Sequence, residues 1–186
     1  RESPEFGRVT STSQSYPVFA EMRRRLSPGT ELAAWWTSSA TSGRGADARS
    51  VEVNYVTPNF FDVLGVRPWQ GRVFGTAEWK GEGEPGVVLT NAFAVSRFGS
   101  GAAAVGKTLD INGATYTVIG IAPPGFIGPI LRQVDVFATM QSGVKQQVGD
   151  NWETNQNMRW LSMVARRSPG VAAEQTSAIA TSAVRD

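Results

Sequence analysis

The chain of 186 residues contains no cysteine and no histidine. A disulfide framework is therefore excluded, and zinc, copper and haem sites lose their usual side-chain ligands. Nucleophilic triads and dyads built on histidine or cysteine are excluded as well. The lack of cysteine fits an oxidising or a reducing compartment, so it gives no location. We expect no metal site and no cofactor.

Long hydrophobic runs are also missing. The best candidate, residues 118–131, is interrupted by Pro123, Pro124 and several glycines, so no run of about 18 apolar residues is available to span a membrane. The chain starts at Arg1 and stops at Asp186 inside a helical pattern. We therefore expect a piece excised from a longer protein, with any signal peptide or membrane span outside it.

An excess of charge of either sign is lacking too, because 18 basic and 16 acidic residues give a net charge of +2. No electrostatic footprint of nucleic-acid binding is present, so no nucleic-acid partner is expected. Three positive charges form the run Arg23, Arg24 and Arg25. We expect this run to cover the end of a helix and to complement its dipole.

The most conspicuous motif is GAAAVGKT at residues 101–108, which matches the phosphate-loop signature G-x-x-x-x-G-K-[ST]. That loop requires a buried strand before it and a helix that starts at the lysine. Here a helical pattern at 91–98 comes first, and Asn112-Gly113 after the motif predicts a hairpin turn. Lys107 is then expected to lie at the start of a strand. A loop without a binding function, with a solvated lysine, is therefore favoured over a nucleotide site.

Periodicity and turn signals predict an α+β fold with mostly adjacent antiparallel pairs. A hydrophobic fraction of 41% is enough for one domain or two small subdomains. The expected helices are 16–26, 58–64, 91–98 and 168–185. The expected strands are 31–37, 51–55, 87–90, both arms of the hairpin centred on 112–113, 134–137 and 158–166, with loops at 38–48, 69–86 and 123–129 and a polar stretch at 142–157.

Two further enzymatic possibilities are weakly supported. Gly149-Asp150-Asn151 is similar to a segment of signal peptidases, which use a serine–lysine dyad. The candidate nucleophile Ser162 lies downstream of every lysine and inside an expected strand, which argues against it. The acidic residues show no spacing typical of a glycosidase, although folding could bring a pair together.

Aromatic and apolar side chains supply the remaining candidates. Trp35 and Trp36 are expected to place one ring on each face of a strand, whereas Trp69, Trp79 and Trp152 lie in loops, where a sugar-binding surface competes with simple burial. The loop at 123–131 either presents apolar side chains to a partner or packs them beneath itself. The candidate partner contacts are Phe126, Ile127, Leu131 and Trp152.

Several ordered stretches resemble the MacB-like periplasmic core domain of permeases of the ABC-transporter superfamily, which are related to FtsX and to lipoprotein-releasing permeases. The matching stretches are residues 56–68 and 71–74, 87–90 and 97–99, 105–109 with 111–113 and 116–120, 123–126, 135–137, and 165–167 with 169–171 and 174–175. The start at residues 15–19 further resembles a subgroup of large duplicated permeases of acidobacteria.

The resemblance implies a porter-like α/β subdomain made by both chain ends, 15–68 and 156–186, with an inserted β-rich subdomain at 69–155. Residues 1–14 are expected to be a linker or remnant. In this family the domain lies outside the cytoplasmic membrane, between the first two transmembrane helices, and is not catalytic. A cytoplasmic ABC ATPase hydrolyses ATP, and the permease conveys the conformational change across the membrane.

The resemblance also implies partners and a range of functions. The expected partners are the ATPase, reached through transmembrane helices, a second permease copy or pseudo-dimer half, and a periplasmic adaptor. Relatives export antibiotics, peptides or lipoproteins, or control cell-wall hydrolases. The alternative is a free-standing extracellular module that binds a ligand with its loop tryptophans.

Overall fold

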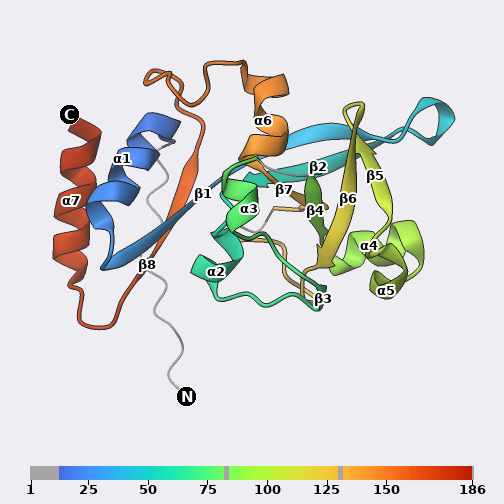
Figure 1. The fold of residues 1–186 in the computed structure, drawn as a ribbon, viewed down its shortest axis with the longest axis horizontal. Coiled ribbons are helices and arrows are strands. Elements are labelled where there is room, and N and C mark those ends of the chain that lie inside the picture. Colours follow the sequence, from blue (N-terminus) through green and yellow to red (C-terminus); the bar gives the residue numbers. More distant parts are fainter. Residues whose placement is uncertain (1–12, 82–83, 130–131, 186) are drawn as a thin grey trace.

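The computed structural model describes residues 13–81, 84–129 and 132–185. It confirms a mixed α and β architecture (Figure 1). The helices are α1 Tyr16–Leu26, α2 Phe60–Leu64, α3 Thr76–Trp79, α4 Asn91–Phe98, α5 Gly101–Ala104, α6 Met140–Val148 and α7 Ala173–Arg185, with a 3-10 turn at Gly45–Asp47. The strands are β1 Thr30–Ser42, β2 Arg49–Val56, β3 Gln70–Gly71, β4 Gly86–Leu89, β5 Thr108–Ile111, β6 Ala114–Ile121, β7 Val136–Thr139 and β8 Ser162–Arg167.

Six strands form a closed ring. The order of the paired strands around the ring is β1, β2, β7, β4, β6 and β5, and β5 pairs with β1 to close it. The closing seam is short: Ser42 is opposite Ile111, and the Gly43 N–H donates to the Asp110 carbonyl oxygen at 3.2 Å. The pairs β2–β7 and β4–β6 are parallel and the others are antiparallel. Closure leaves these strands without a long free edge.

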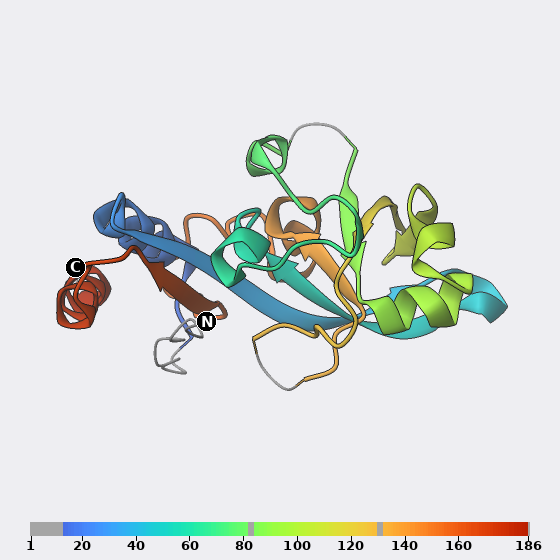
Figure 2. The same cartoon turned by 90° about the horizontal axis from the view of Figure 1, so that it is seen from below.

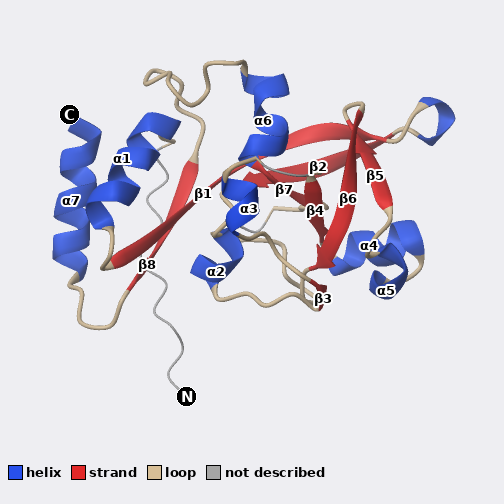
Figure 3. Ribbon diagram, in the orientation of Figure 1, coloured by secondary structure: helices blue, strands red, loops and turns tan. Residues whose placement is uncertain are grey.

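The 13-residue strand β1 belongs to two parts of the molecule. Its first half, residues 30–35, pairs with β8, and its second half, residues 35–42, pairs with β2. Helices α1 and α7 lie side by side at the β8 end, and α4 and α5 lie at the far end (Figure 3). Figure 2 shows β1 running the length of the molecule between them. The strand therefore joins the α1–α7–β8 layer to the ring.

Two apolar clusters lie on opposite faces of the strands. One fills the ring and continues beneath α1, and the other covers the outer face of β2, β7 and β4 under α2. Trp35 lies in the outer cluster with its ring centroid 6.2 Å from that of Phe60, whereas Trp36 faces the other side and stacks on Tyr55 at 5.7 Å. The expectation that the two rings take opposite faces is confirmed.

Several expected boundaries are wrong. The strand expected from residue 158 begins at Ser162, and the expected loop at 69–86 contains β3 and α3. β1 continues through residues 38–42, where serine and threonine had indicated a loop, because their backbone pairs with β2. The polar stretch after residue 142 contains α6, whose buried face is Met140, Gly143 and Val144. Helix α7 begins at Ala173 and not at 168–169.

The division into segments 15–68, 69–155 and 156–186 stays a prediction. Strand β2 of the first segment pairs along residues 53–56 with β7 of the second. Of the expected linker, residues 1–12 lie outside the described residues, and Gln14 forms an antiparallel bridge with Leu161.

Candidate functional site

The phosphate-loop motif has the surroundings that the sequence predicts. Helix α5 occupies its start, the Lys107 N–H donates to the Ala104 carbonyl oxygen at 3.0 Å, and Thr108 opens strand β5. The following turn has positive φ at Asn112 (51°) and Gly113 (83°). Lys107 is exposed at the mouth of this hairpin. No helix starts at the lysine, so the anion-binding geometry of a nucleotide loop is missing from this segment.

The expected partner-contact residues lie in two places. Phe126 packs on Phe61 and Phe137 with ring centroids at 5.9 and 5.7 Å, and Ile127 is half-buried beside it. Leu131 lies outside the described residues. Trp152 is buried, and its ring lies 4.6 Å from that of Tyr16 at the start of α1. A contact between these residues and a partner stays a prediction.

The three tryptophans expected in loops differ in exposure, and Trp79 is the last residue of helix α3. Trp152 is 5% exposed and Trp79 is half-buried, whereas Trp69 is 60% exposed. Over the part of the chain that the structure describes, these tryptophans therefore do not form a joint stacking surface.

Helix α1 carries the polar residues with the most definite geometry. Ser15 is its N-cap and Pro17 lies in its first turn, while Phe19, Met22 and Leu26 at helical spacing bury one face. The run Arg23, Arg24 and Arg25 occupies its last turn, as predicted. Successive residues of a helix are rotated by about 100°, so three adjacent arginines point in three directions.

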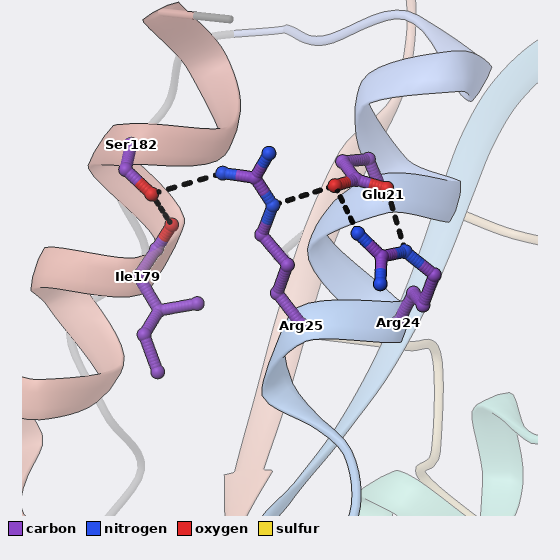
Figure 4. Close-up of polar contacts among 5 residues, drawn as sticks. All are labelled: Glu21, Arg24, Arg25, Ile179 and Ser182. Carbon is purple, nitrogen blue, oxygen red and sulfur yellow. Dashed lines mark hydrogen bonds and ion pairs between the residues drawn. The ribbon is translucent and has the colours of Figure 1, made fainter.

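Arg24 and Arg25 share one carboxylate (Figure 4). Arg24 binds Glu21 with two nitrogen atoms, Nε at 2.9 Å and Nη2 at 2.6 Å, and the Nε of Arg25 binds the same carboxylate at 2.5 Å. Hydrogen bonds from Arg24 and then Arg25 lower the pKa of Glu21 to about 2. The Nη1 of Arg25 also donates to Ser182 Oγ on α7 at 3.1 Å, so the network joins the two helices.

Arg23 points to the other side of α1. Its guanidinium carbon lies 4.1 Å from the centroid of the Trp79 ring, which is a cation–π contact. A pocket of about 360 Å³ adjoins this arginine and is lined by Tyr16, Phe19, Ala20, Arg23, Arg24 and Ser27. Burial, and secondly the charge of Glu153, raise the pKa of Tyr16, while Arg23 opposes them. The phenol is therefore a neutral hydroxyl at pH 7.

Sequence reasoning missed Glu21, Trp79 and Ser182 as members of this site. The spacings of Glu21 to Arg24 and Arg25 are i,i+3 and i,i+4, which is a readable signal for ion pairs on a helix. Nothing local to Trp79 or Ser182 points to α1, because both contacts depend on tertiary packing.

Comparison with known families identifies the chain. The sequence model of the MacB-like periplasmic core domain matches residues 3–183. The chain belongs to this family. It is therefore a periplasmic domain of the kind found in MacB-like ABC transporter permeases, which are not a known enzyme class. Membership in an ABC transporter implies an ATPase partner.

Solved structures of similar fold include the periplasmic region of MacB from Actinobacillus actinomycetemcomitans. It has 16% identity and a TM-score of 0.72, covering 94% of this chain and 74% of that one. The extracellular domain of the noncanonic ABC-type transporter YknZ from Gram-positive bacteria has 15% identity and a TM-score of 0.61, covering 90% and 78%. A domain of a permease protein from Porphyromonas gingivalis has 16% identity and a TM-score of 0.64, covering 93% and 70%.

At these identities the likeness shows the fold alone. The comparison with curated proteins gives no match. Among the helices of the described residues, none has the length and apolar character needed to cross a bilayer. The described residues also contain no group of three or more acidic side chains placed to hold a metal ion.

Proposed function

We propose that this domain works on the extracytoplasmic side of the cytoplasmic membrane as part of a multi-pass ABC permease. There it transmits ATP-driven conformational change or handles a substrate, as in efflux or in the export of lipoproteins or peptides. The observation that carries the proposal is the family match over residues 3–183, which spans nearly the whole chain.

The fold offers a route for transmission. The start and end of the described chain meet in one layer, where Gln14 pairs with Leu161 and α1 packs against α7. Membrane helices attached at the two ends would move this layer. Strand β1 then extends from the layer into the ring, so displacement of α1 and α7 would be passed on by a continuous hydrogen-bonded strand.

The partners follow from this role. The cytoplasmic ATPase would act through the membrane helices, a second permease copy or pseudo-dimer half would lie alongside, and a periplasmic adaptor would contact the domain. Phe126, Ile127, Leu131 and Trp152 remain the proposed partner contacts. Since Trp152 is 5% exposed, its part would be to support the surface at the start of α1.

The test uses the full-length permease with its ATPase in lipid nanodiscs. A fluorophore on Thr115, which is exposed at the β5–β6 hairpin, reports its distance from labelled lipid headgroups by energy transfer. We expect ATP to change the transfer efficiency. Arg25→Ala, which removes the contact with Ser182, is expected to reduce the ATP-dependent change while hydrolysis continues.

Arg24→Ala is the matched control, because it removes a neighbouring charge that binds Glu21 without reaching α7. It should leave the change intact. An efficiency that does not respond to ATP in the wild-type permease would contradict transmission. Hydrophobic spans of about 20 residues on both sides of this segment in the full gene product are expected, and finding none would contradict the permease assignment itself.

A further inference from the structure

We infer that the pocket beside α1 is a binding site for an organic carboxylate attached to an apolar or aromatic group. This inference does not rest on the transmission role. It starts from the pocket described above, whose six lining residues all come from one face of α1 and its C-terminal end. Its position opposite the α7 side leaves it separate from the Arg25–Ser182 contact.

Arg23 supplies a positive charge to the pocket. Within the described part of the chain, the Arg23 side chain makes no hydrogen bond and no ion pair, whereas the Arg24 side chain makes two hydrogen bonds to Glu21. The guanidinium carbon lies 4.1 Å from the centroid of the Trp79 ring, and this cation–π contact positions the group without using its N–H donors in a hydrogen bond. A planar fork of N–H donors fixed in this way is suited to a carboxylate.

Tyr16 and Ser27 supply further donors to the pocket that they line. The hydroxyl groups of both residues have no hydrogen-bond partner among the described residues. Burial keeps the Tyr16 hydroxyl protonated, so it can donate. Two hydroxyl donors beside the Arg23 cation match an anionic ligand, and the positive charge of Arg23 disfavours a cationic one.

The pocket also has the size and the apolar surface to hold an organic ligand. The apolar part of the pocket wall comes from Phe19, Ala20 and the ring of Tyr16. A small inorganic anion has no apolar group to pack against this wall. An apolar cavity of ~150 Å³ holds a benzene molecule. A pocket of about 360 Å³ therefore has room for one ring and a short acid side chain.

The test is a titration of residues 1–186 with 3-phenylpropionate, followed by calorimetry and by amide chemical shifts. We expect saturable binding that shifts the signals of Ala20, Arg23 and the Trp79 indole. The uncharged 3-phenylpropionamide is expected to bind about ten- to a hundredfold more weakly, because it lacks the charge-assisted hydrogen bond. Higher ionic strength should weaken the binding of 3-phenylpropionate and leave the binding of 3-phenylpropionamide unchanged.

Variants assign the binding to the pocket. Arg23→Gln is expected to weaken the binding of 3-phenylpropionate about ten- to a hundredfold, which is the same loss as that expected when the acid is replaced by its amide. Arg44→Gln is the control, since it removes one positive charge at the opposite end of β1 and should leave affinity unchanged. Glu153→Gln should tighten binding, because Glu153 is the acidic neighbour that acts on Tyr16. Unchanged melting temperatures would show that the variants are folded.

Two sources of the carboxylate are distinguished by a tripeptide ending in phenylalanine and its C-terminal amide. Tighter binding of the free-acid tripeptide than of 3-phenylpropionate would assign the site to peptide C-termini, and the reverse order would assign it to free small acids. No saturable binding of either acid, or binding that Arg23→Gln leaves unchanged, would overturn the inference.

Discussion

Three consecutive arginines of α1 make three different contacts. Arg23 lies over Trp79, Arg24 is held by Glu21, and Arg25 reaches from Glu21 to Ser182 of the next helix. All three place a positive charge in the last turn of α1, where it complements the helix dipole, and this effect was predictable from sequence order. Their separate contacts were not, because Trp79 and Ser182 are distant in sequence.

The pH dependence of the network follows from Glu21. Its pKa in the folded chain is about 2, below its ordinary value of 4.5, so its contribution to stability is present above about 4.5 and is lost as the pH falls towards about 2. We expect the melting temperature of the wild type to fall in this window more steeply than that of Glu21→Gln. A side-chain carboxyl titration by NMR checks the pKa directly, and a midpoint at the ordinary value would refute the ion-pair geometry.

Gly143 in α6 provides a packing test at the residue scale. A methyl group there would meet the Tyr55 ring, which is buried, stacked on Trp36 and hydrogen-bonded from Gln147 at 2.6 Å. Exchanging glycine for alanine in a helix normally stabilises by about 1 kcal/mol. Overpacking typically costs about 1–3 kcal/mol, so Gly143→Ala should lower the free energy of unfolding.

The matched control for that exchange is Gln146→Ala, which changes an exposed position of the same helix. Chemical denaturation of both variants measures the difference. A Gly143→Ala chain as stable as the control would mean that α6 does not press on Tyr55.

At the scale of elements, strong local signals were read correctly. The Asn112-Gly113 turn and the helix at residues 16–26 both have short-range causes. Helix α6 was missed because only three of its nine residues are buried, too few for an apolar period. Residues 38–42 of β1 were missed because their serines and threonine gain the strand conformation from pairing with β2.

The hairpin yields a prediction that also tests the phosphate-loop alternative. Gly113 has a φ of 83°, so Gly113→Ala should lower the free energy of unfolding by roughly 1–2 kcal/mol. Lys107→Ala removes an exposed side chain and should change stability by less than about 0.5 kcal/mol. Residues 1–186 should not bind ATP in calorimetry; ATP binding that disappears in Lys107→Ala would reinstate the nucleotide site.

At the scale of the whole molecule, the ring and the α1–α7 layer should differ in local stability. Many ring residues are fully buried, whereas among the described side chains of α7 only Ala183 is buried. Native-state hydrogen exchange should therefore show α7 opening at a lower free energy than β1 and β2. Equal protection of α7 and the ring would indicate one cooperative unit and would contradict the expected difference in local stability.

The architecture as a whole was predictable only in outline. Order and spacing of short motifs indicated the family, and the match over residues 3–183 bears this out. The closure of the ring was not foreseeable, because it depends on a seam between Ser42 and Ile111, which lie 69 positions apart. The boundaries at residues 68 and 155 stay predictions.

The most direct test of the account is the side of the membrane on which this domain lies. In the full-length permease, cleared of other cysteines, Thr115→Cys places one thiol on the exposed face of the hairpin. We predict that a membrane-impermeant maleimide labels it in intact spheroplasts, while a cysteine on the cytoplasmic ATPase reacts only after lysis. Labelling of Thr115→Cys only after lysis would contradict an extracytoplasmic domain.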